Sequence, residues 1–471
     1  MRLLLFGTGE YYNRYKTCLE GEEIVALADN ARQKQGTYMD GALVIPPEDI
    51  ERYEYDALVI MSFYVREIKA QLIRLGIDPQ KIYHFFDLHD LVDRPSMRKK
   101  VRFYGLEEGK EEKGRRRILL LGQDLTLGGP ALALYHAAKA LRKAGYEVWY
   151  VSMIDGPLRE ILLQEGIPVV VDENLLVGTM EETEWIQKIK KCIYLIIYNT
   201  INYHVVLSER DLSIPAVWWL HDALFFYDGV NSRAMERISS ENLKVWAVGP
   251  VARKAIQTYR PDLPVENLLY GVERTQSLEG GVRPDGIQTD KIVRFVTIGY
   301  IEPRKGQDIL LNAIKGLDPA LRRRARFCFV GPDTTAMANE IRKEAENIPE
   351  MILTGPVGRE TINGILSGSD VLVCPSREDP MPTVAAEAMM HGLPCLISDA
   401  AGTAEYIRDG VDGILFPSGD AEQLKGRLEQ CILGNFDLQS MGKKARRIFD
   451  GYFSMEAFER RLFQLIREAD F

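Results

Sequence analysis

One stretch in the last third of the chain decides the fold: residues 371–394 read Val-Leu-Val-Cys-Pro-Ser-Arg-Glu-Asp-Pro-Met-Pro-Thr-Val-Ala-Ala-Glu-Ala-Met-Met-His-Gly-Leu-Pro. The first four residues form the apolar run of a buried strand. Pro382 predicts a helix that begins near Thr383, because proline suits the first turn of a helix. Asp379 lies in the loop, and Glu387 lies eight positions later, one turn into that helix. The stretch therefore predicts a strand, a loop with one carboxylate and a helix with a second.

The loop before this helix has the properties of an anion site. Backbone N–H groups and the positive end of the dipole are free at a helix N-terminus. Carboxylates on both sides can accept hydrogen bonds from vicinal diols, so a nucleotide sugar fits, with two diol-bearing rings joined by a diphosphate. Two alternatives stay open: Asp379 and Glu387 favour an early helix turn electrostatically, or Glu378 takes the place of Asp379.

A second motif, Gly299-Tyr-Ile-Glu-Pro-Arg-Lys-Gly306, follows the expected strand 295–298. Cleavage of a sugar–diphosphate bond leaves negative charge on the departing phosphates, and fixed cations such as Arg304 and Lys305 can stabilise it. Both residues follow the carboxyl end of a strand, where open α/β sheets bind ligands. The alternative is a solvated helix cap.

Two weaker motifs come earlier in the chain. Gly128-Gly129-Pro130 opens a helix after the expected strand 118–121, and small residues let a ligand approach the backbone. Trp218-Trp219-Leu220-His221-Asp222 ends another strand, so His221 is a candidate for a sugar or phosphate contact. A plain turn and a core or capping histidine are the respective alternatives.

Short apolar runs alternate with helix-period segments along the whole chain, which predicts α/β domains with parallel sheets. Three series are separable, at residues 1–95, 118–285 and 286–471, with a mixed-charge linker at 96–117 between the first two. The polar, glycine-rich stretch 273–290 suggests a hinge. Residues Met455–Glu468 carry an apolar stripe and predict a docked amphipathic helix.

Composition excludes several classes. The 471 residues carry 59 Lys and Arg against 68 Asp and Glu, a net charge of −9, which argues against a general nucleic-acid binder. The 46% hydrophobic and 27% charged fractions are those of an ordinary globular protein. The six cysteines show no CxxC pair and no zinc spacing, so we expect a reduced, cytoplasmic protein without a metal site.

No apolar run approaches the ~20 residues that a membrane helix needs. The opening Met1–Gly7 is too short for a secretory signal and lacks a cleavage site. Two basic stretches, Lys188–Lys191 and Arg322–Arg326, are compatible either with peripheral membrane contact or with solvated helix faces.

Taken together and in this order, the four motifs resemble the retaining GT-B glycosyltransferases of the family 4 type, over residues 115–471. That family shows Pro-Ser, an acidic residue, seven residues, then Glu-Ala-Met and Gly-x-Pro. This chain has Pro375-Ser376, Asp379, Glu387-Ala388-Met389 and Gly392-Leu393-Pro394. The segment from Gly402 to Pro417 also resembles the family's next helix and strand. The resemblance implies two Rossmann-like domains around a cleft, an acceptor domain at 118–285 and a donor domain at 286–471, with the last helix packing back on the acceptor domain.

The resemblance also implies roles in the donor domain. Glu387 would bind the nucleotide ribose, and Asp379, in place of the usual Glu, would face the hydroxyls of the donor sugar. Lys305 matches the diphosphate lysine of the family. The family's preceding arginine falls on Tyr300, a departure for which Arg304 is a candidate replacement.

The remaining implied contacts are shared between the domains. Backbone N–H groups of residues around Pro382, which itself donates nothing, would meet the sugar or its phosphates, and the loop after the strand near residue 353 would border the base. The expected binding residues are Met381, Pro382, Thr383, Val384, Gly355 and Val357 in the donor domain, with Gly128, Gly129 and His221 in the acceptor domain. The family works without a metal, and the leaving phosphate helps to deprotonate the acceptor hydroxyl of a glycan, lipid-linked sugar or protein.

The first 95 residues resemble small Rossmann-like domains attached to sugar-modifying enzymes. Gly7 and Gly9 follow the first strand and Asp29 ends the second, but Tyr12 stands where the third glycine of a dinucleotide fingerprint belongs. This argues against NAD and favours an accessory or assembly module, through which the chain could oligomerise.

Two further functions of the whole chain stay open. One is an epimerase or phosphorylase on the same fold. The other is a catalytically silent subunit, since Tyr300 and Asp379 depart from the family.

Overall fold

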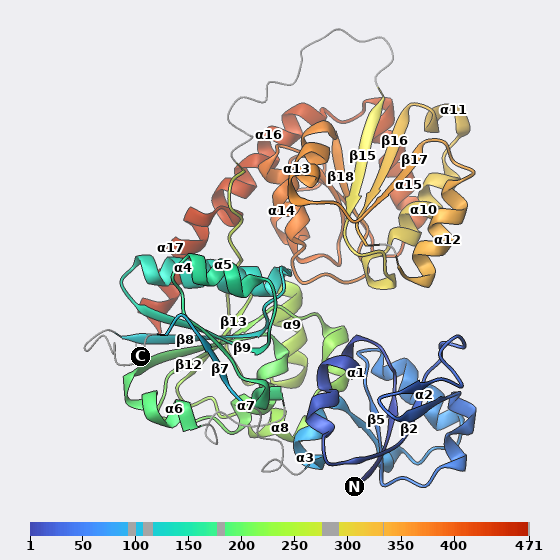
Figure 1. Cartoon of the computed structure of the whole chain (residues 1–471). Helices are drawn as coiled ribbons and strands as arrows, with labels where there is room; N and C mark the ends of the chain where they lie inside the picture. Colours follow the sequence, from blue (N-terminus) through green and yellow to red (C-terminus); the bar gives the residue numbers. More distant parts are fainter. Residues whose placement is uncertain (93–99, 107–115, 177–183, 276–291, 333, 470–471) are drawn as a thin grey trace. The chain divides into compact units, whose positions relative to one another are not determined.

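The computed structural model of the chain contains, in the residues that it describes, three sheets of mainly parallel strands with helices on both faces (Figure 1). The described residues are 1–92, 100–106, 116–176, 184–275, 292–332 and 334–469. The chain divides into two compact units. The first holds residues 1–246 and 254–266, and the second holds residues 247–253 and those from 267 onward.

The first sheet has the order β3-β4-β2-β1-β5-β6, parallel except for the pair β3 and β4. Its strands are β1 Arg2–Phe6, β2 Glu23–Ala28, β3 Tyr38–Met39, β4 Ala42–Ile45, β5 Ala57–Ile60 and β6 Ile82–His84, with helices α1 Glu10–Tyr15, α2 Val65–Arg74 and α3 Leu88–Leu91. The apolar runs that predict β1 and β5 are buried throughout or nearly so, as expected for strands covered on both faces. The order reverses between β1 and β5.

The second sheet has the order β14-β13-β12-β11-β8-β9-β10-β7 and reverses between β8 and β11. Its strands are β7 Arg102–Tyr104, β8 Arg117–Asp124, β9 Glu147–Ile154, β10 Val169–Val171, β11 Ile193–Asn199, β12 Ala216–Leu220, β13 Leu243–Ala247 and β14 Val265–Asn267. The helices are α4 Gly129–Lys143, α5 Leu158–Gln164, α6 Glu184–Ile189, α7 His204–Ser208, α8 Ser232–Arg237 and α9 Pro250–Tyr259.

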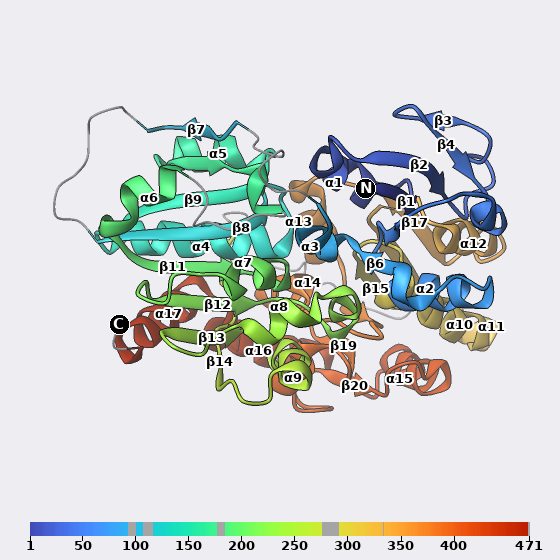
Figure 2. The same cartoon turned by 90° about the horizontal axis from the view of Figure 1, so that it is seen from below.

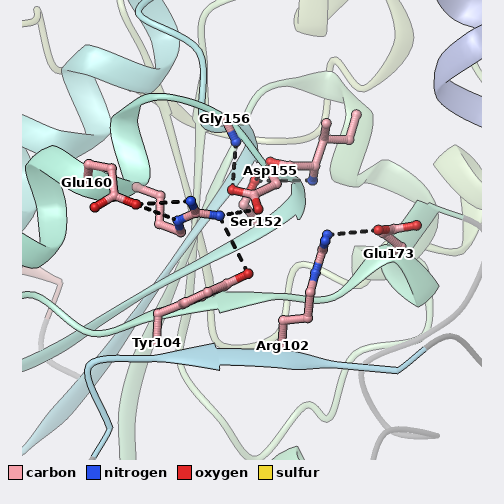
Figure 3. Close-up of polar contacts among 9 residues, drawn as sticks. Arg102, Tyr104, Ser152, Asp155, Gly156, Glu160 and Glu173 are labelled. Carbon is pink, nitrogen blue, oxygen red and sulfur yellow. Dashed lines mark hydrogen bonds and ion pairs between the residues drawn. The ribbon is translucent and has the colours of Figure 1, made fainter.

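Strand β7 lies inside the segment expected to be a linker, so the structure differs from the sequence analysis here. It pairs antiparallel with β10, and Arg102 and Tyr104 are anchored by side chains of neighbouring elements (Figure 3). Arg102 Nη2 lies 2.9 Å from Glu173 Oε1, and the Arg159 guanidinium lies 4.6 Å from the Tyr104 ring centroid. Flanking charges mask this three-residue edge strand in the sequence. Most of segment 96–117 and of the expected hinge lies outside the described residues.

The third sheet is parallel, with the order β17-β16-β15-β18-β19-β20. Its strands are β15 Val293–Ile298, β16 Ala325–Val330, β17 Met351–Gly355, β18 Val371–Cys374, β19 Cys395–Ser398 and β20 Ile414–Phe416. The helices are α10 Gln307–Gly316, α11 Pro319–Arg322, α12 Ala336–Ala345, α13 Arg359–Gly368, α14 Thr383–Met390, α15 Ala421–Leu433, α16 Leu438–Ile448 and α17 Met455–Glu468. The order reverses between β15 and β18, which creates a topological switch point at their carboxyl ends.

The first and second sheets share one hydrophobic core. The Phe63 ring packs edge-on against Phe226, with 5.1 Å between ring centroids. Gly229 lies so close to the His84 imidazole that a Cβ at this position would collide with the ring. The part of the first unit that holds the first sheet, called the first domain below, is therefore packed tightly against loops of the second sheet.

Polar contacts join the same two sheets. Arg66 Nη2 lies 2.7 Å from Asp228 Oδ1, and Asn231 Nδ2 donates to Asp90 Oδ2 at 2.8 Å. Figures 1 and 2 both show α3 of the first sheet beside α8. Arg14 of α1 lies 3.8 Å from Asp124 at the end of β8. The first domain thus reaches the carboxyl ends of strands in the second sheet.

Helix α17 has the apolar stripe that the sequence predicts, and Phe458, Leu462, Leu465 and Ile466 are buried. It packs against the segment after β14, where a Cβ at Gly271 would collide with Met455 of this helix. Arg461 Nε also donates to the carbonyl of Asn267, the last residue of β14, at 3.3 Å. Within the described ranges, no helix is long and apolar enough to cross a membrane.

His84 is buried between the first and second sheets in its neutral form. Its Nε2 lies 3.0 Å from the Ser62 carbonyl oxygen, and burial lowers its pKa to about 3. A histidine in an unfolded chain has a pKa near ~6.5 and takes up a proton well before the folded one does. The stability that neutral His84 contributes is therefore present above pH ~6.5 and is lost as the pH falls below it.

We expect His84→Gln to flatten the acid side of the stability curve. Between pH ~7.5 and ~5.5 the wild type should lose about 1.4 kcal/mol relative to the variant, because only the wild type carries this histidine. Urea unfolding at both pH values measures the difference. Burial raises the pKa values of Asp87 and Asp222 to about 6 and about 7, so these residues change the stability with pH in the opposite direction. Both are present in the wild type and in the variant, so their contributions cancel in the difference. A constant difference across this range would contradict the assignment.

Candidate functional site

The switch point of the third sheet brings two sequence-predicted residues together. Lys305 follows β15 and Asp379 follows β18, and these strands are neighbours. Lys305 Nζ lies 2.6 Å from Asp379 Oδ2. The Asp379 side chain is only 5% exposed, whereas that of Lys305 is 24% exposed. A buried carboxylate thus holds a lysine at the edge where an open α/β sheet binds ligands.

The turn that presents Lys305 depends on Gly306. Residues Pro303–Lys305 form a short 3₁₀ turn, and Gly306 ends it in the left-handed conformation with φ of 69°. A Cβ at Gly306 would collide with the Pro375 carbonyl oxygen of the loop after β18. The Arg377 backbone N–H donates to the Arg304 carbonyl at 2.8 Å, which joins the same two loops. The two loops are held together by backbone contact.

Arg304 already has partners in this structure. Its Nη2 lies 2.8 Å from Glu302 Oε1, and its Nη1 donates to the Glu378 carbonyl at 3.2 Å. Glu378, the rival for the carboxylate position, thus meets Arg304 through its backbone, whereas the Asp379 side chain meets Lys305. The guanidinium also fixes the start of the Asp379 loop.

The loop from Asp379 to Pro382 is fixed at each step. The Gly402 backbone N–H donates to the Asp379 carbonyl at 2.9 Å, and a Cβ at Gly402 would collide with the Pro380 carbonyl oxygen. The Tyr270 hydroxyl donates to the Pro382 carbonyl at 3.0 Å. Burial raises the Tyr270 pKa well above its usual value, and the nearby carboxylates add to this. Tyr270 belongs to none of the sequence motifs, and its partner lies 112 positions away, so no local pattern indicates this contact.

Helix α14 begins at Thr383, with Pro382 as its N-cap, as the sequence predicts. The side chain of Met381 is buried and its sulfur lies 3.2 Å from the Thr403 hydroxyl oxygen. Thr383 and Val384 are half-buried. Their backbone N–H groups belong to the first turn, which has no intrahelical acceptors. They are available to an anion at this end of the helix.

Glu387 is buried in α14 and paired with an arginine that sequence analysis missed. Its side chain is 8% exposed, and its Oε1 lies 2.5 Å from Nη2 of Arg359. Burial raises the pKa of Glu387, and the Arg359 charge and hydrogen bond oppose this shift. The arginine comes from a different helix, so spacing along the chain gives no signal for the pair.

The loop from β17 to α13 holds Gly355 and Val357, both half-buried. Gly355 has a positive φ of 68°, and its carbonyl accepts a hydrogen bond from the Gly331 backbone N–H at 3.0 Å. Arg359 opens α13 directly after this loop. The loop and the ion pair of Glu387 are therefore consecutive parts of one surface of the second unit.

Gly128, Gly129 and His221 belong to the first unit. Gly128 is the N-cap of α4, and its backbone N–H donates to the Thr126 hydroxyl at 3.3 Å. The Thr126 hydroxyl in turn donates to Asp124 Oδ1 at 2.6 Å. The glycines are thus held in an ordered loop at the carboxyl end of β8.

His221 follows β12 in the same sheet. Its ring lies 4.6 Å from that of Trp219, and burial lowers its pKa to about 3. Its Nε2 is buried without a hydrogen-bond partner among the residues that the structure describes. Asp222 accepts from the Ile201 backbone N–H at 2.6 Å. Thr200, at the switch point of this sheet, has a strained φ of 70°, and such strain is typical of functional sites.

In the first sheet, Asp29 is saturated by its own domain. The Thr8 and Ala31 backbone N–H groups donate to it at 2.9 and 2.8 Å, and Lys34 lies 3.5 Å away. The hydroxyl of Tyr12 donates to Asp40 at 2.8 Å. The carboxylate that would bind a ribose in a dinucleotide fold is therefore occupied.

Comparison with known proteins matches both ends of the chain to families. Residues 284–448 match the family Glycosyl transferases group 1, and residues 1–83 match the family C2185-like, N-terminal. The chain is 24% identical over 254 residues to an uncharacterized glycosyltransferase, MJ1178, of Methanocaldococcus jannaschii, covering 53% of this chain and 67% of that protein. It is 26% identical over 191 residues to a D-inositol 3-phosphate glycosyltransferase of Saccharomonospora viridis, covering 39% of this chain but only 43% of that protein.

A solved structure, Anabaena Alr3699/HepE in complex with UDP and glucose, has a TM-score of 0.60 at 20% identity. It covers 75% of this chain, and all of that chain is covered. At this identity the likeness shows the fold. The expected GT-B fold, with two Rossmann-like sheets and an additional N-terminal sheet, is confirmed.

We expect Gly306→Ala to destabilise the second unit. An alanine in the left-handed conformation costs about 1–3 kcal/mol, and its Cβ would also collide with the Pro375 carbonyl oxygen. Denaturant unfolding measures the loss. Gly426→Ala in α15 is the matched control, because no atom lies near its Cβ and alanine should stabilise the helix by about 0.5–1 kcal/mol. Equal stability of the two variants would contradict the described turn.

Proposed function

We propose that this chain is a retaining glycosyltransferase that moves a sugar, of the hexosyl class, from a nucleotide-diphosphate donor to a hydroxyl group. The Lys305–Asp379 pair at the switch point of the third sheet carries this proposal. It lies within residues 284–448, which match Glycosyl transferases group 1. Three-quarters of the chain also share the fold of a protein solved with UDP and glucose.

In this proposal each donor-side residue has one task. Lys305 stabilises the charge that develops on the departing diphosphate, and the first backbone N–H groups of α14, at Thr383 and Val384, assist it. Asp379 accepts hydrogen bonds from sugar hydroxyls, and Glu387 accepts them from the ribose. The Gly355 and Val357 loop borders the base, while Arg304 mainly holds the Asp379 loop through the Glu378 carbonyl.

The reaction forms a bond from C1 of the sugar to the acceptor oxygen and breaks the bond from C1 to the phosphate oxygen. In a same-face mechanism the proton of the acceptor hydroxyl passes to the leaving phosphate. The donor thus supplies the base, and the protein supplies binding, orientation and charge. Gly128, Gly129 and His221, at carboxyl ends of strands in the second sheet, are our candidates for close approach of the acceptor and contact with the donor sugar.

UDP is our first choice of nucleotide, because the Anabaena protein was solved with UDP and UDP-glucose. A glycan, lipid-linked sugar or protein is the proposed acceptor, with polysaccharide biosynthesis as the setting. We propose a cytoplasmic location, which the six free cysteines support. For the first domain we propose a role in acceptor binding or assembly without NAD, supported by the occupied Asp29 carboxylate.

Peripheral membrane contact is a further proposal. Lys190 forms an ion pair with Asp211, and Arg322 lies 3.0 Å from Glu350. Each pair offsets one positive charge of its basic stretch. The positive charge that is left would attract an anionic membrane.

We expect Lys305→Ala to lower kcat/KM for transfer or donor hydrolysis by about 100- to 1,000-fold, the loss typical of removing one charge-stabilising group. We expect Glu387→Ala to weaken UDP binding by about tenfold or more, because a hydrogen bond to a charged group is lost. Product release measures the loss of kcat/KM in Lys305→Ala, and calorimetric titration with UDP measures the loss of affinity in Glu387→Ala. Lys315→Ala is the control, since Lys315 lies on α10 in an exposed pair with Glu344. Near-normal behaviour of both site variants would reject the assignment.

We expect the product to keep the anomeric configuration of the donor, and activity to survive EDTA, because Lys305 rather than a divalent cation neutralises the leaving group. Proton NMR of the product during turnover checks the first point. Inversion would reject the same-face mechanism. Turnover without an acceptor, other than slow hydrolysis, would favour an epimerase, and nucleotide binding without turnover would favour a silent subunit.

A further inference from the structure

The Glu387–Arg359 pair joins a buried acid to an exposed base. The carboxylate is 8% exposed in α14, whereas the Arg359 side chain is 59% exposed at the first position of α13. The two groups are 2.5 Å apart, and the arginine is the more exposed side chain of the pair. A ligand that reaches Glu387 therefore meets Arg359 as well.

The position of Arg359 conflicts with local helix preference. Residue Gly358 caps α13 without a side-chain hydrogen bond, and a cation in the first turn opposes the positive end of the helix dipole. An acidic side chain would suit this position better. The Glu387 carboxylate compensates for the conflict, and such a conflict between local preference and global structure is typical of functional sites.

The charge state of Glu387 depends on this neighbour. Burial raises the pKa of Glu387 and favours its neutral form, and Arg359 opposes this shift. A neutral carboxyl group has one acceptor oxygen fewer for a vicinal diol, since its hydroxyl donates instead. Among the residues that the structure describes, Tyr270 is coupled to Glu387 and His391 to Arg359; Tyr270 is buried and keeps its proton, and the pKa of His391 is lowered mainly by burial.

We propose that Arg359 is a positioning residue that keeps the Glu387 carboxylate ionised and oriented for the two ribose hydroxyls, so that the donor site selects ribonucleoside diphosphates over their 2′-deoxy counterparts. This inference rests on the proposed function, because it assumes that Glu387 faces a nucleotide. Arg359 follows the Gly355 and Val357 loop directly, which joins the ribose contact to the proposed base contact. A 2′-deoxyribose leaves the ionised carboxylate with one hydrogen bond fewer.

The test is calorimetric titration of the full chain with UDP, GDP and ADP and with their 2′-deoxy forms, between pH ~5.5 and ~8. We expect the wild type to prefer one ribonucleotide by about tenfold or more over its 2′-deoxy form, with little change across this range. In Arg359→Ala the preference should fall to about threefold or less. Its affinity should decline more steeply than that of the wild type as the pH falls, because Glu387 takes up a proton, whereas the terminal phosphate of the nucleotide titrates equally in both proteins. Arg359→Lys should restore both.

Two further variants make the result specific. Arg408→Ala is the matched control, because Arg408 is also exposed, at 73%, and pairs with a buried acid, Asp412, 2% exposed, in the same unit. It should bind like the wild type. The double variant Arg359→Ala with Glu387→Gln has no carboxylate at this position, so the pH dependence that Arg359→Ala shows beyond that of the wild type should disappear.

The outcomes separate this inference from the proposed function. If the wild type binds none of the six nucleotides, this inference is rejected together with UDP, GDP and ADP as donor nucleotides, whereas transfer from a donor with another base is tested by product release. If it binds one and Arg359→Ala keeps the affinity, the preference and the pH profile of the wild type, only the role of Arg359 is overturned. Tighter binding by Arg359→Ala would also overturn it, since the arginine would then obstruct Glu387. If thermal melting shows that Arg359→Ala is unfolded, Arg359→Gln takes its place in the same comparison.

Discussion

The close approach of Gly306 to the Pro375 carbonyl is the constraint on which the rest of the donor-side structure depends. It brings the loop after β15 against the loop after β18, and Lys305 and Asp379 come from these two loops. A parallel sheet alone gives neighbouring strand ends, but it does not fix how their loops meet. Here the second backbone contact, between Gly402 and the Pro380 carbonyl, fixes the far side of the same loop. The charged pair therefore rests on backbone packing.

Much of the fold is readable from the sequence, because continuous apolar runs and helix caps are local signals. The run before Pro375 and the helix start at Thr383 lie where the sequence predicts them. The motifs at residues 299–306 and 371–394 also identify Lys305 and Asp379, which form an ion pair in the structure. Neither Arg359 nor Tyr270 belongs to one of the motifs, and no local pattern points to their partners, which lie 28 and 112 positions away. Strand β7 escapes for another reason: three residues between charged stretches carry too little periodicity.

The packing of the first domain, which holds the first sheet, is the feature that the sequence indicates least. As a separate series of strands and helices it suggests an accessory module joined by a charged linker. Phe63 packs on Phe226, and the imidazole of His84 lies against Gly229, so the module shares its core with the second sheet. Arg14 reaches Asp124 at the end of β8, next to the loop that holds Gly128. The first domain thus lies beside the carboxyl end of β8 in the second sheet.

The shared core has a consequence for synthesis of the protein. When the ribosome has made the first sheet, Phe63 and His84 are present, but the loop around Phe226 and Gly229 is still untranslated. At about 5–20 residues per second, roughly seven to thirty seconds pass before that loop has been translated. During this time an apolar face is open to other nascent chains and to chaperones. The yield of the protein in a cell should therefore depend on translation speed across the second sheet.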